Sequence, residues 1–287
     1  MSGPGPLLTT EWLAARLGQP GIRAIDASWH MPASGRNAQA EYLEAHIPGA
    51  VFFDLDAASN PASPLPHMLP TPAAFAAAMS AIGLSSSDML VVYDTSGINL
   101  SAPRAWWTFR VMGHEQVAVL DGGLGRWRSE GRPVESGPVE LPRGNFMATL
   151  DESRIRSAEQ MAANLTSRTE QVVDARSRGR FEGTVPEPRP GLRGGHIPGS
   201  RSLPFQELVT EDGTMRSAPE LEARFRKAGI DPERPLVASC GSGVTAAALL
   251  HALEVAGFPG GALYDGSWTE WGGREDLPVE RNEASRH

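Results

Sequence analysis

The sequence has 287 residues, of which 40% are hydrophobic and 21% charged, and its formal net charge is −8. This composition is typical of a globular protein large enough for two domains. The acidic balance and the lack of a basic run argue against a nucleic-acid surface. A single cysteine excludes an intramolecular disulfide framework and favours a reducing compartment. The N-terminus lacks the features of a signal peptide and no apolar stretch is long enough to span a bilayer, so we expect a cytoplasmic protein without membrane contact.

Four short motifs occur twice, in the same order along the chain. The pairs are Ile25-Asp26-Ala27 with Val173-Asp174-Ala175, His46-Ile47-Pro48-Gly49 with His196-Ile197-Pro198-Gly199, Asp121-Gly122-Gly123 with Asp265-Gly266-Ser267, and Pro133-Val134-Glu135 with Pro278-Val279-Glu280. Their spacings differ by only a few residues. The two halves of the chain are therefore copies of one module.

Each copy alternates short apolar strands with helices. We expect strands over 50–53, 89–93 and 117–120 in the first copy, and over 201–203, 236–239 and 262–264 in the second. We expect helices over 10–17, 73–82, 157–163, 221–228 and 244–256. This alternation predicts an α/β protein of two tandem domains, each a small doubly wound parallel sheet flanked by helices. The first domain should cover 1–140 and the second 153–287, joined by a Pro- and Gly-rich linker over 136–152.

The only cysteine, Cys240, stands where a predicted strand turns into a predicted helix. Gly241, Ser242 and Gly243 follow it, and such a turn directs backbone N–H groups inward at the positive end of the helix dipole. Both effects favour a reactive thiolate. The alternative is a buried structural cysteine, which is common for free thiols. When the two copies are aligned, Asp94 of the first copy stands at the position of Cys240. Only the second copy can therefore carry thiol chemistry.

With these motifs the sequence resembles the tandem-domain rhodanese sulfurtransferases over about residues 8–278. The loop Cys240–Thr245 is similar to the branch of the family that uses 3-mercaptopyruvate, whereas thiosulfate-using members usually carry basic residues there. The resemblance implies that sulfur passes from 3-mercaptopyruvate, through a persulfide on Cys240, to a thiol, cyanide or thioredoxin, with release of pyruvate. It implies no metal or organic cofactor, and we expect a monomer.

The resemblance also implies roles for individual residues. Family members with the segment found here at 179–190 use its two arginines to hold the substrate carboxylate, which assigns Arg180 and Arg189. In the mercaptopyruvate branch, the counterparts of Asp56, His67 and Ser242 are proposed to act together, the aspartate orienting the histidine and the histidine polarising the serine. The remaining loop residues expected to bind the substrate sulfur are Gly241, Gly243, Val244 and Thr245. The alternatives are solvated loop arginines and a histidine that caps a turn.

Three other functions compete with this interpretation. The same chemistry with thiosulfate as donor would require positive charge that Gly241 and Ser242 do not supply. A cysteine phosphatase requires an arginine six residues after the cysteine, where this chain has Ala246. A non-catalytic rhodanese-like binding module fits the first copy, which has Asp94 at the cysteine position, but does not account for Cys240 in the second.

Overall fold

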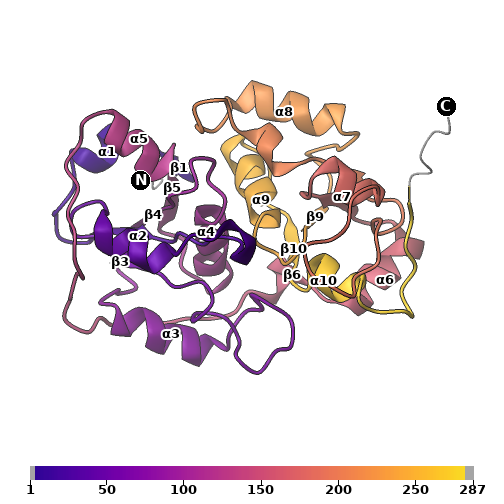
Figure 1. Cartoon of the computed structure of the whole chain (residues 1–287), viewed down its shortest axis with the longest axis horizontal. Helices are drawn as coiled ribbons and strands as arrows, with labels where there is room; N and C mark the ends of the chain where they lie inside the picture. The colour runs from indigo at the N-terminus through magenta and orange to yellow at the C-terminus, as the bar shows by residue number, and fades with distance from the viewer. Residues whose placement is uncertain (1–3, 282–287) are drawn as a thin grey trace. The chain divides into compact units, whose positions relative to one another are not determined.

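Each half of the chain forms one five-stranded, all-parallel sheet in the computed structural model, which describes residues 4–281 (Figure 1). The strands of the first sheet are β1 (Leu7–Leu8), β2 (Ile22–Asp26), β3 (Val51–Phe52), β4 (Met89–Tyr93) and β5 (Val117–Leu120). Their spatial order is β1-β5-β4-β2-β3, and every neighbouring pair is parallel.

The second sheet repeats that order. Its strands are β6 (Ile155–Arg156), β7 (Gln171–Asp174), β8 (Arg201–Ser202), β9 (Leu236–Ser239) and β10 (Ala262–Tyr264), arranged β6-β10-β9-β7-β8. Every neighbouring pair is again parallel. The predicted fold class, two doubly wound parallel sheets, is confirmed.

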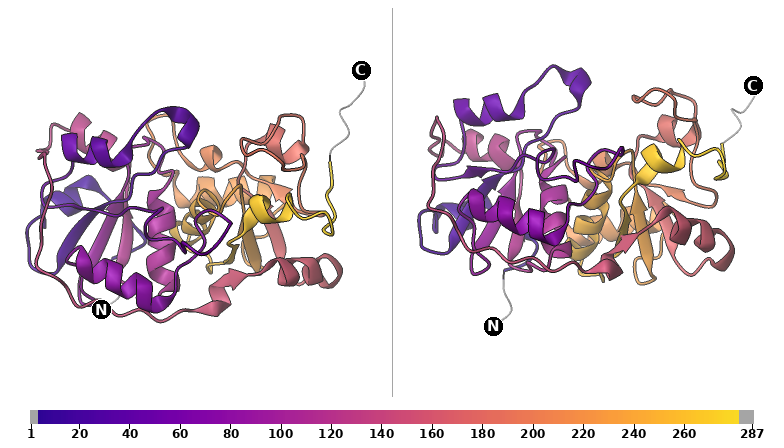
Figure 2. Two further views of the ribbon diagram at one scale, coloured as in Figure 1. Left: turned by 60° about the horizontal axis from the view of Figure 1, so that its bottom comes forward. Right: turned by 90° about the horizontal axis from the view of Figure 1, so that it is seen from below.

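Helices connect the strands and flank both sheets (Figure 2). In the first half they are α1 (Thr10–Ala14), α2 (Ala38–Glu44), α3 (Pro72–Ala81), α4 (Ala102–Val111) and α5 (Gly123–Ser129). In the second half they are α6 (Ala158–Ser167), α7 (Arg178–Glu182), α8 (Ala218–Lys227), α9 (Ala246–Val255) and α10 (Ser267–Trp271). Three-residue and four-residue 3₁₀ turns lie at Pro32–Ser34, Glu152–Arg154 and Phe205–Leu208.

The central strands and the helix after each of them form the core. All residues of β4 and β9 are buried, as expected for strands covered on both faces. Helix α9 is buried from Ala246 to Leu253 without a polar stripe, apart from His251. A helix that is apolar all round has to lie inside the protein, so α9 holds the loop before it on a rigid base.

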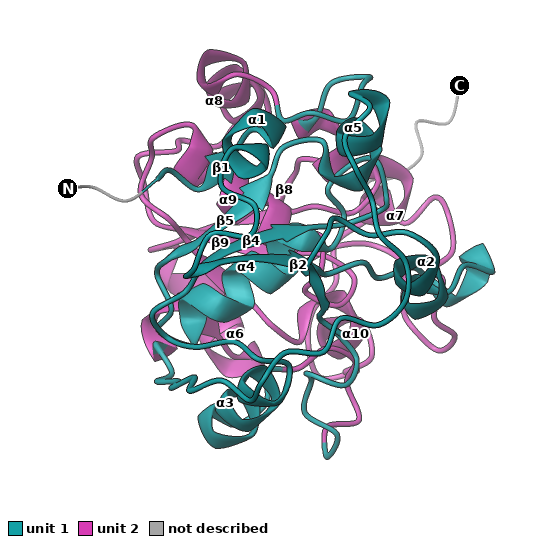
Figure 3. Cartoon of the chain, turned by 90° about the vertical axis from the view of Figure 1, so that its left-hand side faces the viewer, with its two compact units in different colours: residues 1–62, 69–151, 209–215 teal, residues 63–68, 152–208, 216–287 magenta. Residues whose placement is uncertain are grey.

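The chain divides into two compact units that exchange two short segments (Figure 3). Unit 1 contains 1–62, 69–151 and Val209–Met215, and unit 2 contains Ser63–Met68, 152–208 and 216–287. The exchanged segments occupy the same place in the repeat, between an edge strand and the capped helix that follows it. Each unit therefore receives one loop from the other half of the sequence.

Candidate active site

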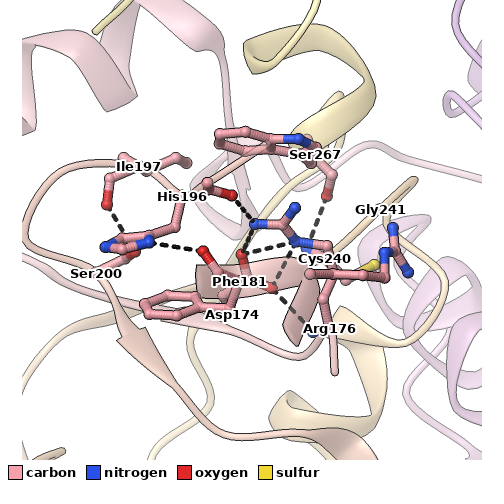
Figure 4. A network of polar contacts seen from close by, with 12 residues as sticks. Asp174, Arg176, Phe181, His196, Ile197, Ser200, Cys240, Gly241 and Ser267 are labelled. Atoms are coloured by element: carbon pink, nitrogen blue, oxygen red, sulfur yellow. Dashed lines mark hydrogen bonds and ion pairs between the residues drawn. The ribbon is translucent and has the colours of Figure 1, made fainter. Parts of the chain in front are cut away.

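Cys240 directly follows β9, at the carboxyl edge of the second sheet, and is 2% exposed. Its backbone N–H donates to Ser267 Oγ at 3.2 Å, and its carbonyl accepts from the Trp268 N–H at 2.9 Å. Ser267 adopts a left-handed conformation, with φ of +49°, and donates its hydroxyl to the Tyr264 carbonyl. The D-G-S turn thus fixes the backbone that carries the thiol (Figure 4).

The loop after Cys240 presents backbone donors that the protein leaves open. Gly243, with φ of +78°, turns the chain toward α9. Within residues 4–281, the N–H groups of Ser242, Val244 and Thr245 donate to no protein acceptor, although Ser242 and Val244 are buried. Buried amides without acceptors are unfavourable unless a ligand supplies one. The loop is therefore suited to hold an anion next to the thiol.

The equivalent loop of unit 1 shows how such donors are satisfied. The Asp94 carboxylate accepts from the backbone N–H groups of Ser96, Ser101 and Ala102, each at 2.9 Å. Asp94 is 1% exposed, and Gly97 turns the chain at φ of +77°, three residues after Asp94 as Gly243 is after Cys240. The first copy thus carries its own anion, where the second copy carries a thiol and open amides.

His67 reaches the cysteine loop in unit 2. Its Nδ1 lies 3.0 Å from Ser242 Oγ, and the histidine is 5% exposed. It holds φ of +62°, a conformation that is uncommon for a residue with a side chain. The equivalent position of the other copy, four residues before the cap of the next helix, is Gly213. The fold therefore does not demand a histidine there.

Arg180, in α7, lies against the same loop. Its Nη2 atom is 2.9 Å from the position that a Cβ on Gly241 would occupy, so any side chain at residue 241 would collide with the guanidinium. The Arg180 side chain is 21% exposed. A side chain at residue 241 would therefore push the Arg180 guanidinium away from the loop.

Two buried side chains, Glu187 and Arg176, fix the position of Arg180. Glu187, whose side chain is 2% exposed, accepts from Arg180 Nη2 at 2.6 Å and from Arg176 Nη1 at 2.7 Å. Arg176 is fully buried, donates to Asp174 at 2.7 Å and lies over the Trp268 ring at 4.3 Å. Glu187 thus joins the guanidinium at the loop to a second one anchored in the core.

The first copy shows what Arg176 contributes. Asp26 is the counterpart of Asp174, and Ser28 stands where the second copy has Arg176. Without that cation, burial raises the pKa of Asp26 to about 6. Arg176 thus supplies the counter-charge that Asp174 and Glu187 need in order to be buried.

The structure therefore brings together the loop Cys240–Thr245, His67 and Arg180. Arg189 follows in the irregular segment between α7 and β8 and is half-buried, and its role remains a prediction. Asp56 belongs to unit 1, where its Oδ2 accepts from Trp29 Nε1 at 3.2 Å. Its action on His67 likewise remains a prediction.

Sequence reasoning assigned no role to Glu187, Arg176 or Ser267. A weak signal for Glu187 existed, because an acid placed between two candidate substrate arginines must face at least one of them. For Ser267 the signal was the change from Gly123 in the first copy to serine in the second.

The two histidines of the H-I-P-G turns have the same structural environment. His46 Nδ1 contacts the Tyr42 carbonyl at 2.7 Å and its ring stacks on Tyr42, while His196 Nδ1 contacts the Phe181 carbonyl at 2.8 Å and its ring stacks on Phe181. Both hold a turn, in the copy with the cysteine and in the copy without it.

No group of three or more His, Cys, Asp or Glu among residues 4–281 is arranged to hold a metal ion. No helix in that range is long and apolar enough to cross a bilayer.

The model of the rhodanese-like domain matches residues 9–130 and 157–274, so the chain belongs to the rhodanese family, as its motifs predicted. It is 47% identical to the 3-mercaptopyruvate sulfurtransferase of Escherichia coli K12, over 94% of this chain and 96% of the relative. It is 46% identical to the thiosulfate sulfurtransferase of Bos taurus, over 92% and 91%. The crystal structure of SseA from Escherichia coli, described as a 3-mercaptopyruvate sulfotransferase, matches with a TM-score of 0.85 and 43% identity, over 92% of this chain and 99% of that one. These relatives confirm the predicted enzyme class, a sulfurtransferase.

Proposed function

We propose that this protein moves a sulfur atom from 3-mercaptopyruvate, through a persulfide on Cys240, to a thiol or cyanide acceptor and releases pyruvate. Relatives of nearly equal identity are named for 3-mercaptopyruvate and for thiosulfate, so the donor has to be inferred from the site. The observation that carries the inference is the cysteine loop itself. It offers open amides and a nearby guanidinium from Arg180 but has no basic side chain of its own.

The reaction has two half-reactions. The Cys240 thiolate attacks the sulfur of 3-mercaptopyruvate, forming an S–S bond while the C–S bond breaks. The electron pair of the broken bond stays on the carbon skeleton as the enolate of pyruvate, which then takes up a proton. The acceptor attacks the outer sulfur of the persulfide, and Cys240 leaves as a thiolate. The open amides of Ser242, Val244 and Thr245 would hold the anionic outer sulfur between the two steps.

The substrate carboxylate would bind Arg180 and Arg189. Guanidinium groups hold carboxylates through two parallel hydrogen bonds, and this fixes the orientation of a small keto acid. Glu187 keeps Arg180 facing the loop, because it also binds the buried Arg176. Substrate orientation thus depends on a side chain that need not touch the substrate.

Ser242 and His67 would act on the substrate carbonyl. The 3.0 Å contact between His67 Nδ1 and Ser242 Oγ allows the histidine to polarise the hydroxyl toward an oxygen that becomes negative in the enolate. Asp56 would orient His67. Here the serine stabilises charge and the cysteine attacks, so the arrangement differs from a serine protease.

Replacing Glu187 by glutamine is expected to raise the KM for 3-mercaptopyruvate and to lower kcat/KM by about 10-fold to 100-fold. The two arginines lose the carboxylate that they share, so Arg180 no longer has a fixed position. Steady-state kinetics measures the effect, and Glu187→Asp should recover part of the loss. The control is Glu222→Gln, which removes an acid of α8 2.8 Å from Arg226 and should change kcat/KM by less than about threefold. A lower KM in Glu187→Gln would instead mean that Glu187 competes with the substrate for Arg180.

A direct comparison of donors tests the proposed function. We expect kcat/KM for 3-mercaptopyruvate, followed as pyruvate release, to exceed that for thiosulfate, followed as sulfite release, by about 10-fold or more. The physical reason is that a dianionic donor lacks side-chain cations within the loop. A preference for thiosulfate would overturn the donor and leave the persulfide mechanism standing. Absence of turnover with either donor would favour a non-catalytic binding module.

The setting of the reaction remains a proposal. A reactive thiol requires a reducing compartment, and this supports a cytoplasmic location for the protein. The same condition supports a small thiol or thioredoxin as the sulfur acceptor. The relative from Arabidopsis thaliana, 44% identical over 98% of this chain and 79% of its own length, is named as mitochondrial. A monomer is consistent with a chain that carries both copies of the module.

A further inference from the structure

A cavity of about 610 Å³ lies in unit 2 at the amino edge of the second sheet. Its walls include Gln171 at the start of β7, Arg201 at the start of β8, and Arg234 just before β9. Cys240 follows β9 at the opposite, carboxyl edge. The cavity is therefore separate from the cysteine loop and serves no step of the proposed reaction.

Three arginines of this cavity have no partner among the residues that the structure describes. Arg168, Arg201 and Arg234 are exposed, and within residues 4–281 none of their side chains forms an ion pair or a hydrogen bond. The protein carries 34 acidic residues against 26 basic ones, so carboxylates are in excess. What distinguishes these three unpaired guanidiniums is that they line one cavity, although acidic side chains are in excess.

The acidic residues of the cavity do not neutralise these arginines. Glu170 is held by Arg156, with its two oxygens at 2.6 and 2.9 Å from the guanidinium. Glu280 accepts from the Gly199 N–H at 2.9 Å and lies 3.8 Å from His196. Arg156 thus neutralises Glu170, while Glu280 keeps its charge, so one carboxylate faces three guanidiniums and the lining of the cavity stays positive.

A second, smaller cavity extends the same cationic surface. Its volume is about 330 Å³, and it shares Gly199, Arg201 and Glu280 with the first. It adds Lys227, at the end of α8, which is the only lysine of the chain and has no partner within residues 4–281. Arg201 stands between the two cavities.

The internal repeat shows that the fold does not require these cations. Strand register makes Val51 the counterpart of Arg201 and Asp88 the counterpart of Arg234. Pro20 corresponds to Arg168, five residues before the matched strand positions Ile25 and Val173. None of the counterparts is basic, and one of them is acidic. The arginines are therefore a property of the second copy, separate from the architecture that both copies share.

We infer that this cavity binds a small multivalent oxyanion, carrying phosphate or carboxylate groups on a body of up to nucleotide size. Guanidiniums bind phosphate and carboxylate oxygens in pairs, and three of them suit a ligand with at least two negative charges. A volume of 610 Å³ lies within the range of cavities that hold small ligands. Leu165, Val172 and Pro198 give the cavity an apolar wall against which the ligand body can pack.

Calorimetric titration of the full chain, in low-salt buffer free of phosphate, tests this site. The probes are inorganic pyrophosphate, ADP and citrate. We expect saturable binding of at least one probe that weakens as KCl is added. In the double variant Arg201→Gln/Arg234→Gln, the dissociation constant of that probe should rise by about 10-fold or more. The control, Arg143→Gln, removes an exposed arginine of unit 1 that has no partner within residues 4–281, and should bind as the unaltered chain does.

The pattern of binding separates the possible sources of the oxyanion. Binding of pyrophosphate and ADP without citrate indicates a phosphorylated ligand, and the reverse indicates a polycarboxylate. ADP binding more tightly than pyrophosphate would indicate that the apolar wall is used. Absence of binding by all three probes, or equal binding by the double variant and the unaltered chain, would overturn the inference. Because the readout is binding, the result does not depend on the proposed sulfur donor.

Discussion

Replacing Cys240 by serine is expected to lower sulfur transfer by about 10⁴-fold or more, because a hydroxyl cannot form a persulfide. Exposure of the unaltered protein to 3-mercaptopyruvate, without acceptor, should add the mass of one sulfur atom to the peptide that contains Cys240. Mass spectrometry of the intact protein and of its peptides measures this directly. The variant should show no added sulfur. Its melting temperature should change little, since serine replaces a small side chain with one of nearly the same shape.

Ser242→Ala provides a graded comparison at the same loop. It removes the hydroxyl that His67 contacts at 3.0 Å but leaves the thiol and the backbone amides in place. We expect it to form the persulfide about 10²-fold more slowly and to release that sulfur to an acceptor at a nearly normal rate. If Cys240→Ser retained pyruvate release, the persulfide mechanism would be wrong. If Ser242→Ala were as inactive as Cys240→Ser, the serine hydroxyl would have a role in the reaction beyond stabilising negative charge.

The sheet and its order of elements could be predicted because both copies carry strong local signals. The predicted strands 89–93, 117–120, 236–239 and 262–264 agree with β4, β5, β9 and β10 at both ends. Buried parallel strands are continuous apolar runs, so their limits are easy to find. The short helices α2, α5, α7 and α10 and the two-residue strands β1 and β6 were not predicted. Segments of two to seven residues contain too little periodicity, and tertiary packing decides their structure.

The candidate site was predictable where chemistry is local and unpredictable where it depends on distant contacts. Cys240 and its loop could be assigned from one turn between a strand and a helix. The contact between His67 and Ser242 joins residues 175 positions apart, and only the family resemblance suggested it. The Glu187 link between Arg180 and Arg176 had no counterpart in the motif analysis, because it depends on how a loop folds back on α7. The internal repeat provided a comparison for the cysteine loop, because it places Asp94 at the position equivalent to Cys240. Composition alone offers no such comparison.

Replacing Asp94 by alanine is expected to destabilise unit 1. Asp94→Ala should lower the free energy of unfolding of unit 1 by about 3 kcal/mol, because it leaves the buried N–H groups of Ser101 and Ala102, and the half-buried N–H of Ser96, without an acceptor. For a unit of this size the loss corresponds to a fall in melting temperature of about 10 °C. Differential scanning calorimetry measures it. Asp94→Asn keeps the shape and one acceptor oxygen, so it should lose about half as much. The control, Glu44→Ala, removes an exposed acid of the same unit and should be nearly neutral.

The variant Asp94→Ala also tests whether both copies of the loop need a bound anion. If the carboxylate of Asp94 is what satisfies its loop, an added anion should partly restore the stability of Asp94→Ala, as it can enter the space left by the side chain. Chloride and formate are suitable probes, because they are small enough to reach a position that is 1% exposed in the unaltered chain. Stabilisation of Asp94→Ala by formate, with no comparable effect on Glu44→Ala or on the unaltered chain, would show that a rhodanese-like loop needs an anion even where it performs no chemistry. It would follow that the open amides beside Cys240 form a site that the persulfide completes. Unchanged stability of Asp94→Ala would instead mean that the loop tolerates unsatisfied amides, and the case for the anion site beside Cys240 would then lose its internal control.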